Sequence, residues 1–177
     1  MNFRIIFLLL FVATLTGCKE FDKLTQFEMA YNETVTIPSS SGINLPFNII
    51  SPDIESNYES EFAVNDTRKD LVETIYLKSM KLIVNSPSNG DLSFLKSVAI
   101  YIVADSLPEI KIAWKENIPD TVGSEIDLET SNDDIKAYII KDKFMLKVNT
   151  VTDKIITSDY EVNINSVFWV DAKILGQ

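Results

Sequence analysis

The 177-residue chain has no histidine and a single cysteine, and its 26 acidic against 16 basic side chains give a formal net charge of −10. The lack of histidine excludes Ser-His-Asp and Cys-His catalysis, the usual zinc and iron sites and the commonest general base near neutral pH. The acidic surface argues against nucleic acid as a partner because it repels phosphate groups, and one cysteine cannot close a disulfide within the chain. We expect one domain with no bound cofactor or metal.

The N-terminal segment has the composition of an export signal. Arg4 supplies a positive charge, and the apolar run over residues 5–15 is shorter than the roughly 20 residues that a membrane span needs. The run ends in Leu15-Thr16-Gly17-Cys18, which resembles the lipobox of bacterial lipoproteins. That resemblance implies removal of residues 1–17 and attachment of a diacylglyceryl group to the Cys18 thiol. Two or more acyl chains would then hold the protein stably to a bilayer.

The residues after Cys18 bear on the destination of the anchored protein. Lys19-Glu20 lacks the aspartate at the second mature position that retains many Gram-negative lipoproteins in the inner membrane. A lysine beside an acidic residue at this place is similar to the surface-export signals of Bacteroidetes lipoproteins. With the Ile-, Asn- and Lys-rich composition, the chain resembles small lipoproteins of Bacteroidetes-like bacteria, which have β-sandwich domains of unassigned activity. The resemblance implies an anchor at the outer membrane, on its periplasmic or its outer face, and assigns no active residue.

The mature chain starts with a polar tether over residues 18–26, and residues 27–177 form the expected domain. Apolar and polar residues alternate over residues 27–37 and again over residues 43–49, which predicts two strands separated by a turn. Pro46 favours an edge position or a β-bulge for the second strand.

The stretch that follows mixes several signals. Residues 51–57 predict a loop, residues 62–64 a short strand, and residues 67–72 the start of a helical turn. Residues 74–84 predict a strand with a β-bulge near Ser79, because the apolar positions change phase there.

The second half of the domain continues the strand pattern. After a turn at residues 86–90, residues 98–103 are apolar on both faces, which predicts a central strand. A short helix capped by Ser131 is predicted over residues 131–139, with Ile135, Tyr138 and Ile139 on its buried face. The other predicted strands cover residues 110–114, 125–130, 144–148, 160–164 and 167–174.

Eight or nine short strands with one or two short helices predict a mostly β domain built as an antiparallel sandwich. The Cys-Trp-Cys hallmark of antibody domains is missing, so an immunoglobulin-like architecture would be a likeness of layout alone. A jelly roll is the alternative.

The segment Glu125-Ile126-Asp127-Leu128-Glu129 is the sharpest catalytic candidate, because residues i, i+2 and i+4 of a strand share a face. It resembles the Glu-x-Asp-x-Glu catalytic strand of the jelly-roll retaining glycoside hydrolases related to laminarinases and lichenases. The resemblance implies Glu125 as the nucleophile, Asp127 as the residue that orients it, and Glu129 as the acid/base. A solvated strand face in an acidic protein explains the same pattern, and we favour that interpretation. Asn132-Asp133-Asp134 likewise fits a helix cap better than a calcium loop.

Large aromatic side chains are the remaining candidates for contact with a partner. Trp114 is in phase with Ile110 and Ile112, which predicts a core position. Phe168 and Trp169 must point to opposite faces of a strand, and the more apolar phase of Phe168 predicts that Trp169 is at least partly exposed. We therefore expect a membrane-anchored, non-catalytic binding or structural module with Trp169 at its contact site for an unidentified glycan or protein. The alternative is the carboxylate-based glycosidase described above.

Overall fold

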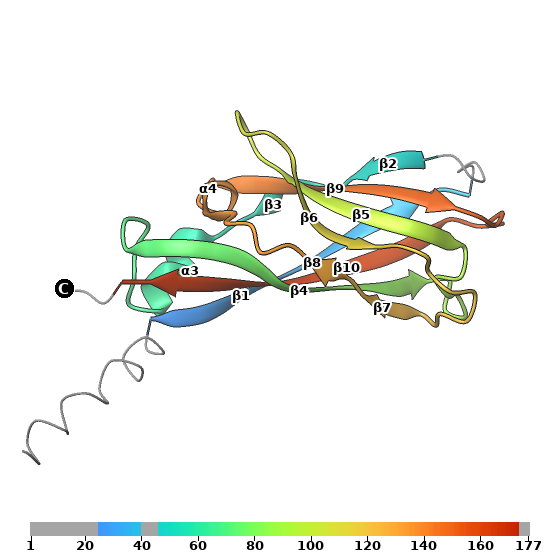
Figure 1. The fold of residues 1–177 in the computed structure, drawn as a ribbon, viewed down its shortest axis with the longest axis horizontal. Helices are drawn as coiled ribbons and strands as arrows, with labels where there is room; N and C mark the ends of the chain where they lie inside the picture. Colours follow the sequence, from blue (N-terminus) through green and yellow to red (C-terminus); the bar gives the residue numbers. More distant parts are fainter. Residues whose placement is uncertain (1–24, 40–45, 174–177) are drawn as a thin grey trace, which may run out of the picture.

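Two antiparallel β-sheets pack face to face in the computed structural model, which describes residues 25–39 and 46–173 (Figure 1). The expected mostly β antiparallel sandwich is therefore confirmed. Within these two ranges there are ten strands and two short helices. No helix of the described residues is long and apolar enough to cross a membrane. The predicted signal segment, Cys18 and most of the tether lie outside the described residues, as does Ile174.

The strands form two sheets, which we name A and B. Sheet A contains, from edge to edge, β1 (Gln26–Ile37), β10 (Tyr160–Ala172), β4 (Val72–Ser86) and β7 (Glu125–Asp127). Sheet B contains β2 (Pro46–Ile50), β9 (Lys143–Thr152), β5 (Leu95–Val103), β6 (Ile110–Lys115) and β8 (Glu129–Thr130), and β3 (Ile54–Glu55) also pairs with β9. The helices are α3 (Tyr58–Val64) and α4 (Lys136–Ile139).

Strand β10 contributes alternate side chains to the core between the sheets. The two strands predicted over residues 160–164 and 167–174 are one continuous strand in the middle of sheet A. Every second side chain of β10 is buried, and the intervening ones are half-buried on the outer face, except for the exposed Glu161. The buried set is Val162, Ile164, Ser166, Phe168, Val170 and Ala172.

Three aromatic rings join the two sheets across the core. Tyr31 of β1 and Phe168 of β10 come from sheet A, and Phe144 of β9 comes from sheet B. The ring centroids lie 5.4 to 6.1 Å apart in edge-to-face arrangements, a geometry that adds to the hydrophobic gain of burial. The Tyr31 hydroxyl donates a hydrogen bond to the backbone oxygen of Ser56, and burial raises the pKa of Tyr31 well above its usual range.

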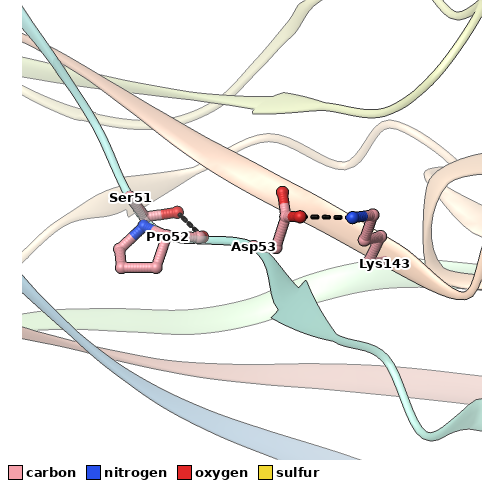
Figure 2. Close-up of polar contacts among 4 residues, drawn as sticks. All are labelled: Ser51, Pro52, Asp53 and Lys143. Carbon is pink, nitrogen blue, oxygen red and sulfur yellow. Dashed lines mark hydrogen bonds and ion pairs between the residues drawn. The ribbon is translucent and has the colours of Figure 1, made fainter.

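The edge of sheet B is held together where β9 changes partner from β2 to β3. The Ser51 backbone N–H donates to the Leu146 carbonyl at 2.8 Å, and the Leu146 N–H donates to the Ser51 hydroxyl oxygen at 2.9 Å. Figure 2 shows that the Ser51 hydroxyl also donates to the Pro52 carbonyl at 2.8 Å, and that Asp53 forms an ion pair with Lys143. These bonds satisfy polar groups of the three-residue break between the strands.

Three details of the strand predictions are confirmed. Strand β2, which begins at Pro46, lies at the edge of sheet B. Strand β5 lies between β9 and β6, as expected for residues 98–103. The pairing of β10 with β4 passes from Val167 opposite Ser79 to Phe168 opposite Leu77, so Lys78 is the extra residue of a β-bulge at the predicted place.

The predicted short strand over residues 62–64 is wrong, because these residues lie in helix α3. Tyr58 and Phe62, four residues apart, are both buried on one face of this helix, whereas Val64 is 81% exposed. The helical turn predicted over residues 67–72 is a tight turn, closed by a hydrogen bond from the Leu71 N–H to the Arg68 carbonyl at 2.9 Å. The predicted loop over residues 51–57 contains the short strand β3.

Helix α4 is shorter than predicted, and Ser131 does not cap it. The Ser131 N–H donates to the Ile112 carbonyl, which holds Ser131 on sheet B before the helix begins. The Asp134 carboxylate accepts hydrogen bonds from the N–H groups of Lys136 and Ile75, at 3.0 and 3.1 Å. The three apolar residues predicted to face the core, Ile135, Tyr138 and Ile139, are buried.

Candidate functional site

The carboxylates at 125, 127 and 129 are divided between the two sheets. Strand β7 pairs with β4 of sheet A and β8 pairs with β6 of sheet B, so the chain crosses from one sheet to the other at the buried Leu128. The prediction of one strand over residues 125–130 is therefore wrong. Burial of the Leu128 side chain between the sheets directs the chain from sheet A to sheet B at this residue.

Lysine side chains neutralise these carboxylates. The Lys81 ammonium lies 3.5 Å from a Glu125 oxygen and 3.7 Å from an Asp127 oxygen, and the Lys115 ammonium lies 3.9 Å from Glu129. The three acidic side chains are 58% to 80% exposed. A retaining glycosidase needs one carboxyl kept protonated and both held about 5 to 5.5 Å apart around the substrate, and nothing in these open ion pairs favours that arrangement. In the described ranges no group of three or more acidic or cysteine side chains is placed to hold a metal ion.

Trp169 lies half-buried on the outer face of sheet A, opposite the fully buried Phe168. Its cross-strand neighbours are Glu28 on β1 and Tyr76 on β4. The Lys78 ammonium lies 5.1 Å from the centroid of the Trp169 ring and forms an ion pair with Glu28. Lys78 lies two residues after Tyr76 on β4, on the same outer face as the ring. Two aromatic side chains from adjacent strands therefore share one patch of surface with a paired acid and base.

Amide side chains continue the same outer face along β10. Asn165 lies opposite Asn32, and Asn163 lies opposite Thr34, whose hydroxyl donates to the Asn163 side-chain oxygen at 2.8 Å. The side-chain oxygen of Asn165 is shielded from solvent and has no hydrogen-bond partner among the described residues. The seven residues from Asn163 to Trp169 extend over about 20 Å of strand. We call the surface of Glu28, Tyr76, Lys78, Asn163, Asn165 and Trp169 the Trp169 face.

The predicted core position of Trp114 is wrong, because Trp114 is half-buried on the outer face of sheet B. The pairing of β5 with β6 passes from Ile100 opposite Ala113 to Tyr101 opposite Lys111, so Ile112 is the extra residue of a bulge. Ile112 and Ala113 are both fully buried as a result, and the phase of the strand changes after them. The Lys111 ammonium lies 4.7 Å from the centroid of the Trp114 ring.

The sequence analysis missed Tyr76 as a neighbour of Trp169. The sequence does indicate that Tyr76 lies on the outer face, because it alternates with the buried Ile75 and Leu77. The register that brings it beside Trp169 comes from the pairing of two residues 93 positions apart in the chain, and a single sequence does not contain that information.

No family model matches the chain, and no curated protein matches it. Among solved structures, one of Desmodium yellow mottle tymovirus overlaps 85% of each chain with 15% identity and a TM-score of 0.32. Turnip yellow mosaic virus overlaps 85% of this chain and 98% of its own with 7% identity and a TM-score of 0.28. A CBM32 structure from Clostridium perfringens, solved with GalNAc-β-1,3-galactose, overlaps 81% of this chain and 96% of its own with 11% identity and a TM-score of 0.31. Scores this low carry no inference about what this chain does.

Proposed function

We propose that the chain is a lipid-anchored, non-catalytic binding module at the outer membrane, and that it contacts a glycan through the Trp169 face. The observation that carries the proposal is the pairing of Trp169 with Tyr76, two large aromatic side chains on adjacent strands at the outer surface of sheet A. Aromatic rings supply a large contact area with few rotatable bonds, and they stack on the apolar faces of sugar rings.

The lipid anchor rests on the sequence of residues 15–18, which resembles a lipobox. Without residues 1–17 the chain has 15 basic and 26 acidic side chains, a net charge of −11. Such a chain is repelled by anionic head groups, so acyl chains on Cys18 are the attachment that its composition allows. Whether the module faces the periplasm or the cell exterior follows from the sorting of the anchor and not from the domain.

A glycan fits the Trp169 face better than a flat apolar partner does. The amide groups of Asn163 and Asn165 lie on the same face as the two rings, and amide groups both donate to and accept from sugar hydroxyl groups. The patch extends along β10, which suits an extended chain of several sugar units. The ion pair of Glu28 with Lys78 leaves this face without a strong net charge, so a neutral glycan is the partner we propose.

A printed panel of neutral glycans, probed with the purified lipoprotein in detergent, tests the proposal. Trp169→Ala should weaken binding at least tenfold, because a stacking ring and its desolvated contact are lost. Trp114→Ala is the matched control, since it removes a half-buried tryptophan with an overlying lysine from the outer face of the other sheet. Binding that survives Trp169→Ala, or the absence of binding to every glycan of the panel, contradicts the proposed contact.

A further inference from the structure

A hollow of about 410 Å³ lies between two loops at one end of the sandwich. One loop joins β4 to β5 and supplies lining residues between Pro87 and Phe94. The other joins β9 to β10 and supplies lining residues from Lys154 onward, up to Tyr160 at the start of β10. The volume falls within the range of about 300 to 1,000 Å³ that is usual for small-molecule sites.

The position of the hollow is set by the strand directions. Strand β1 begins at Gln26 at the left of Figure 1, and β4 begins at the same end. Both run to the opposite end, where β4 leads into the first loop and β10 starts at Tyr160. Twelve residues of β1 span about 40 Å. The hollow is therefore on the far side of the domain from the point where the chain enters the fold.

Close backbone contacts hold the walls of the hollow. A Cβ built on Gly90 would lie 2.9 Å from both the Pro87 oxygen and a ring carbon of Tyr160, so only glycine lets the first loop approach that ring. The Gly90 N–H donates to the Pro87 carbonyl at 2.8 Å, and the Asp153 N–H donates to the Phe94 carbonyl at 3.1 Å, which joins the two loops. These contacts fix the two loops against each other and against the Tyr160 ring.

The lining combines an aromatic pair with hydrogen-bonding groups of both kinds. The rings of Tyr160 and Phe94 pack with their centroids 4.6 Å apart. Hydrogen bonds from the side chain and backbone of Ser93 lower the pKa of Asp91, so Asp91 is an ionised acceptor at neutral pH. Lys154 is a donor, and its ammonium charge is balanced by Asp120 at 2.6 Å. Hydroxyl and amide groups of the two loops supply the remaining polar contacts.

We propose that this hollow binds one neutral sugar unit, the end of a glycan whose chain continues along β10 to Trp169, nine residues and about 30 Å from Tyr160. The proposal deepens the proposed function and rests on it. A sugar unit presents hydroxyl groups that both donate and accept, together with an apolar ring face, and the hollow offers Asp91, Lys154 and Tyr160 for these roles. A purely apolar ligand would leave the polar lining without partners. An anion would meet the Asp91 carboxylate and a lysine that is already paired, so neither class fits as well.

The location agrees with display from a lipid anchor. The eight residue-to-residue steps from Cys18 to Gln26 reach at most about 28 Å, which keeps the entry end of the domain near the bilayer. The loops around the hollow would stand about 40 Å farther away, at the end that first meets material outside the membrane.

The test uses the purified lipoprotein in detergent and a printed panel of neutral mono- and oligosaccharides built from glucose, galactose, mannose, fucose and their N-acetyl derivatives. Asp91→Asn removes the charge of the acceptor at constant size, and Asn89→Trp places a bulky ring at the exposed rim of the hollow. Both should weaken binding at least tenfold. Asp70→Asn is the matched control, because it makes the same chemical change in an exposed ion pair with Arg68 outside the hollow.

Hydrogen exchange then separates the two proposed contacts. Bound sugar should protect the backbone amides of residues 88–94 and 153–159. If a glycan binds with full affinity to Asp91→Asn and Asn89→Trp while Trp169→Ala abolishes binding, the hollow proposal is overturned and the proposed function stands. If the hollow variants lose binding while Trp169→Ala keeps it, the Trp169 face is overturned as the contact and the hollow remains. A panel that gives no binding at all contradicts both.

Discussion

The neighbours Phe168 and Trp169 provide an internal comparison of the two faces of β10. Phe168 is fully buried between the sheets, and Trp169 is half-buried on the outer face. We expect Phe168→Ala to destabilise the domain far more than Trp169→Ala, although tryptophan is the larger side chain.

The structure sets the two magnitudes. Phe168→Ala removes edge-to-face contacts with Tyr31 and Phe144 and leaves a cavity in the core, a change that typically costs about 3 to 5 kcal/mol. Trp169→Ala leaves no enclosed cavity. It removes a cation–π contact with Lys78, worth about 0.5 to 1 kcal/mol, and a cross-strand contact with Tyr76 of about 0.2 to 1 kcal/mol. We therefore expect a loss of about 1 to 2 kcal/mol.

Urea unfolding followed by far-UV circular dichroism measures both values without depending on tryptophan fluorescence. In thermal melts the same free energies correspond to decreases of about 6 to 20 °C for Phe168→Ala and about 2 to 8 °C for Trp169→Ala. Equal losses for the two variants would refute the reasoning, because they would show that the outer face of sheet A is packed like the core. In that case the Trp169 face has no surface to offer a partner.

Three other predictions concern substitutions of single residues. Glu125→Gln should change the free energy of unfolding by less than about 0.5 kcal/mol, since the carboxylate is an exposed partner of Lys81, and the wild-type protein should hydrolyse no β-glucan. Hydrolysis by the wild type that the variant lacks would restore the glycosidase interpretation. Burial raises the pKa of Glu33 on β1, because the ionised carboxylate is less well solvated in the folded protein. The free energy of unfolding therefore has its full value below about pH 4, where Glu33 is protonated, and decreases as the pH rises and Glu33 ionises. Glu33→Gln should accordingly raise the melting temperature at about pH 7 and change it little at about pH 4; a gain of the same size at both values would contradict this assignment. Gly90→Ala should cost about 1 to 3 kcal/mol in denaturant unfolding, because the added carbon meets backbone and ring atoms, and a neutral result would show that the loop moves freely.

The sandwich could be predicted because alternation with a period of two is strong in long, half-buried strands. The alternation continues through the thirteen residues of β10, and it correctly places Phe168 on the inner face and Trp169 on the outer face. The bulge near Ser79 could also be predicted, because two polar residues, Lys78 and Ser79, make the change of phase visible. The bulge in β6 is hidden in the sequence, since its neighbours Ile112 and Ala113 are both apolar and both buried. That difference explains why the prediction for Trp114 failed.

Short elements and contacts between distant segments explain the other failures. Phe62 and Val64 alone fit a strand as well as a helix, and Tyr58, four residues before Phe62, is the residue that distinguishes the two. Three carboxylates with period two predict one strand, but the crossing between the sheets at Leu128 depends on tertiary packing. The hollow between the two loops leaves no periodic signal, because residues about 65 positions apart in the chain form it.

Attachment through Cys18 is the premise of the proposed function, and metabolic labelling with radioactive palmitate tests it most directly. The wild-type protein should incorporate label and sediment with membranes, whereas Cys18→Ser should incorporate none and accumulate as a longer, uncleaved or misplaced species. A Thr25→Ser variant, altered outside the predicted lipobox, serves as the control and should be labelled like the wild type. Equal labelling of Cys18→Ser and the wild type would contradict the proposed anchor.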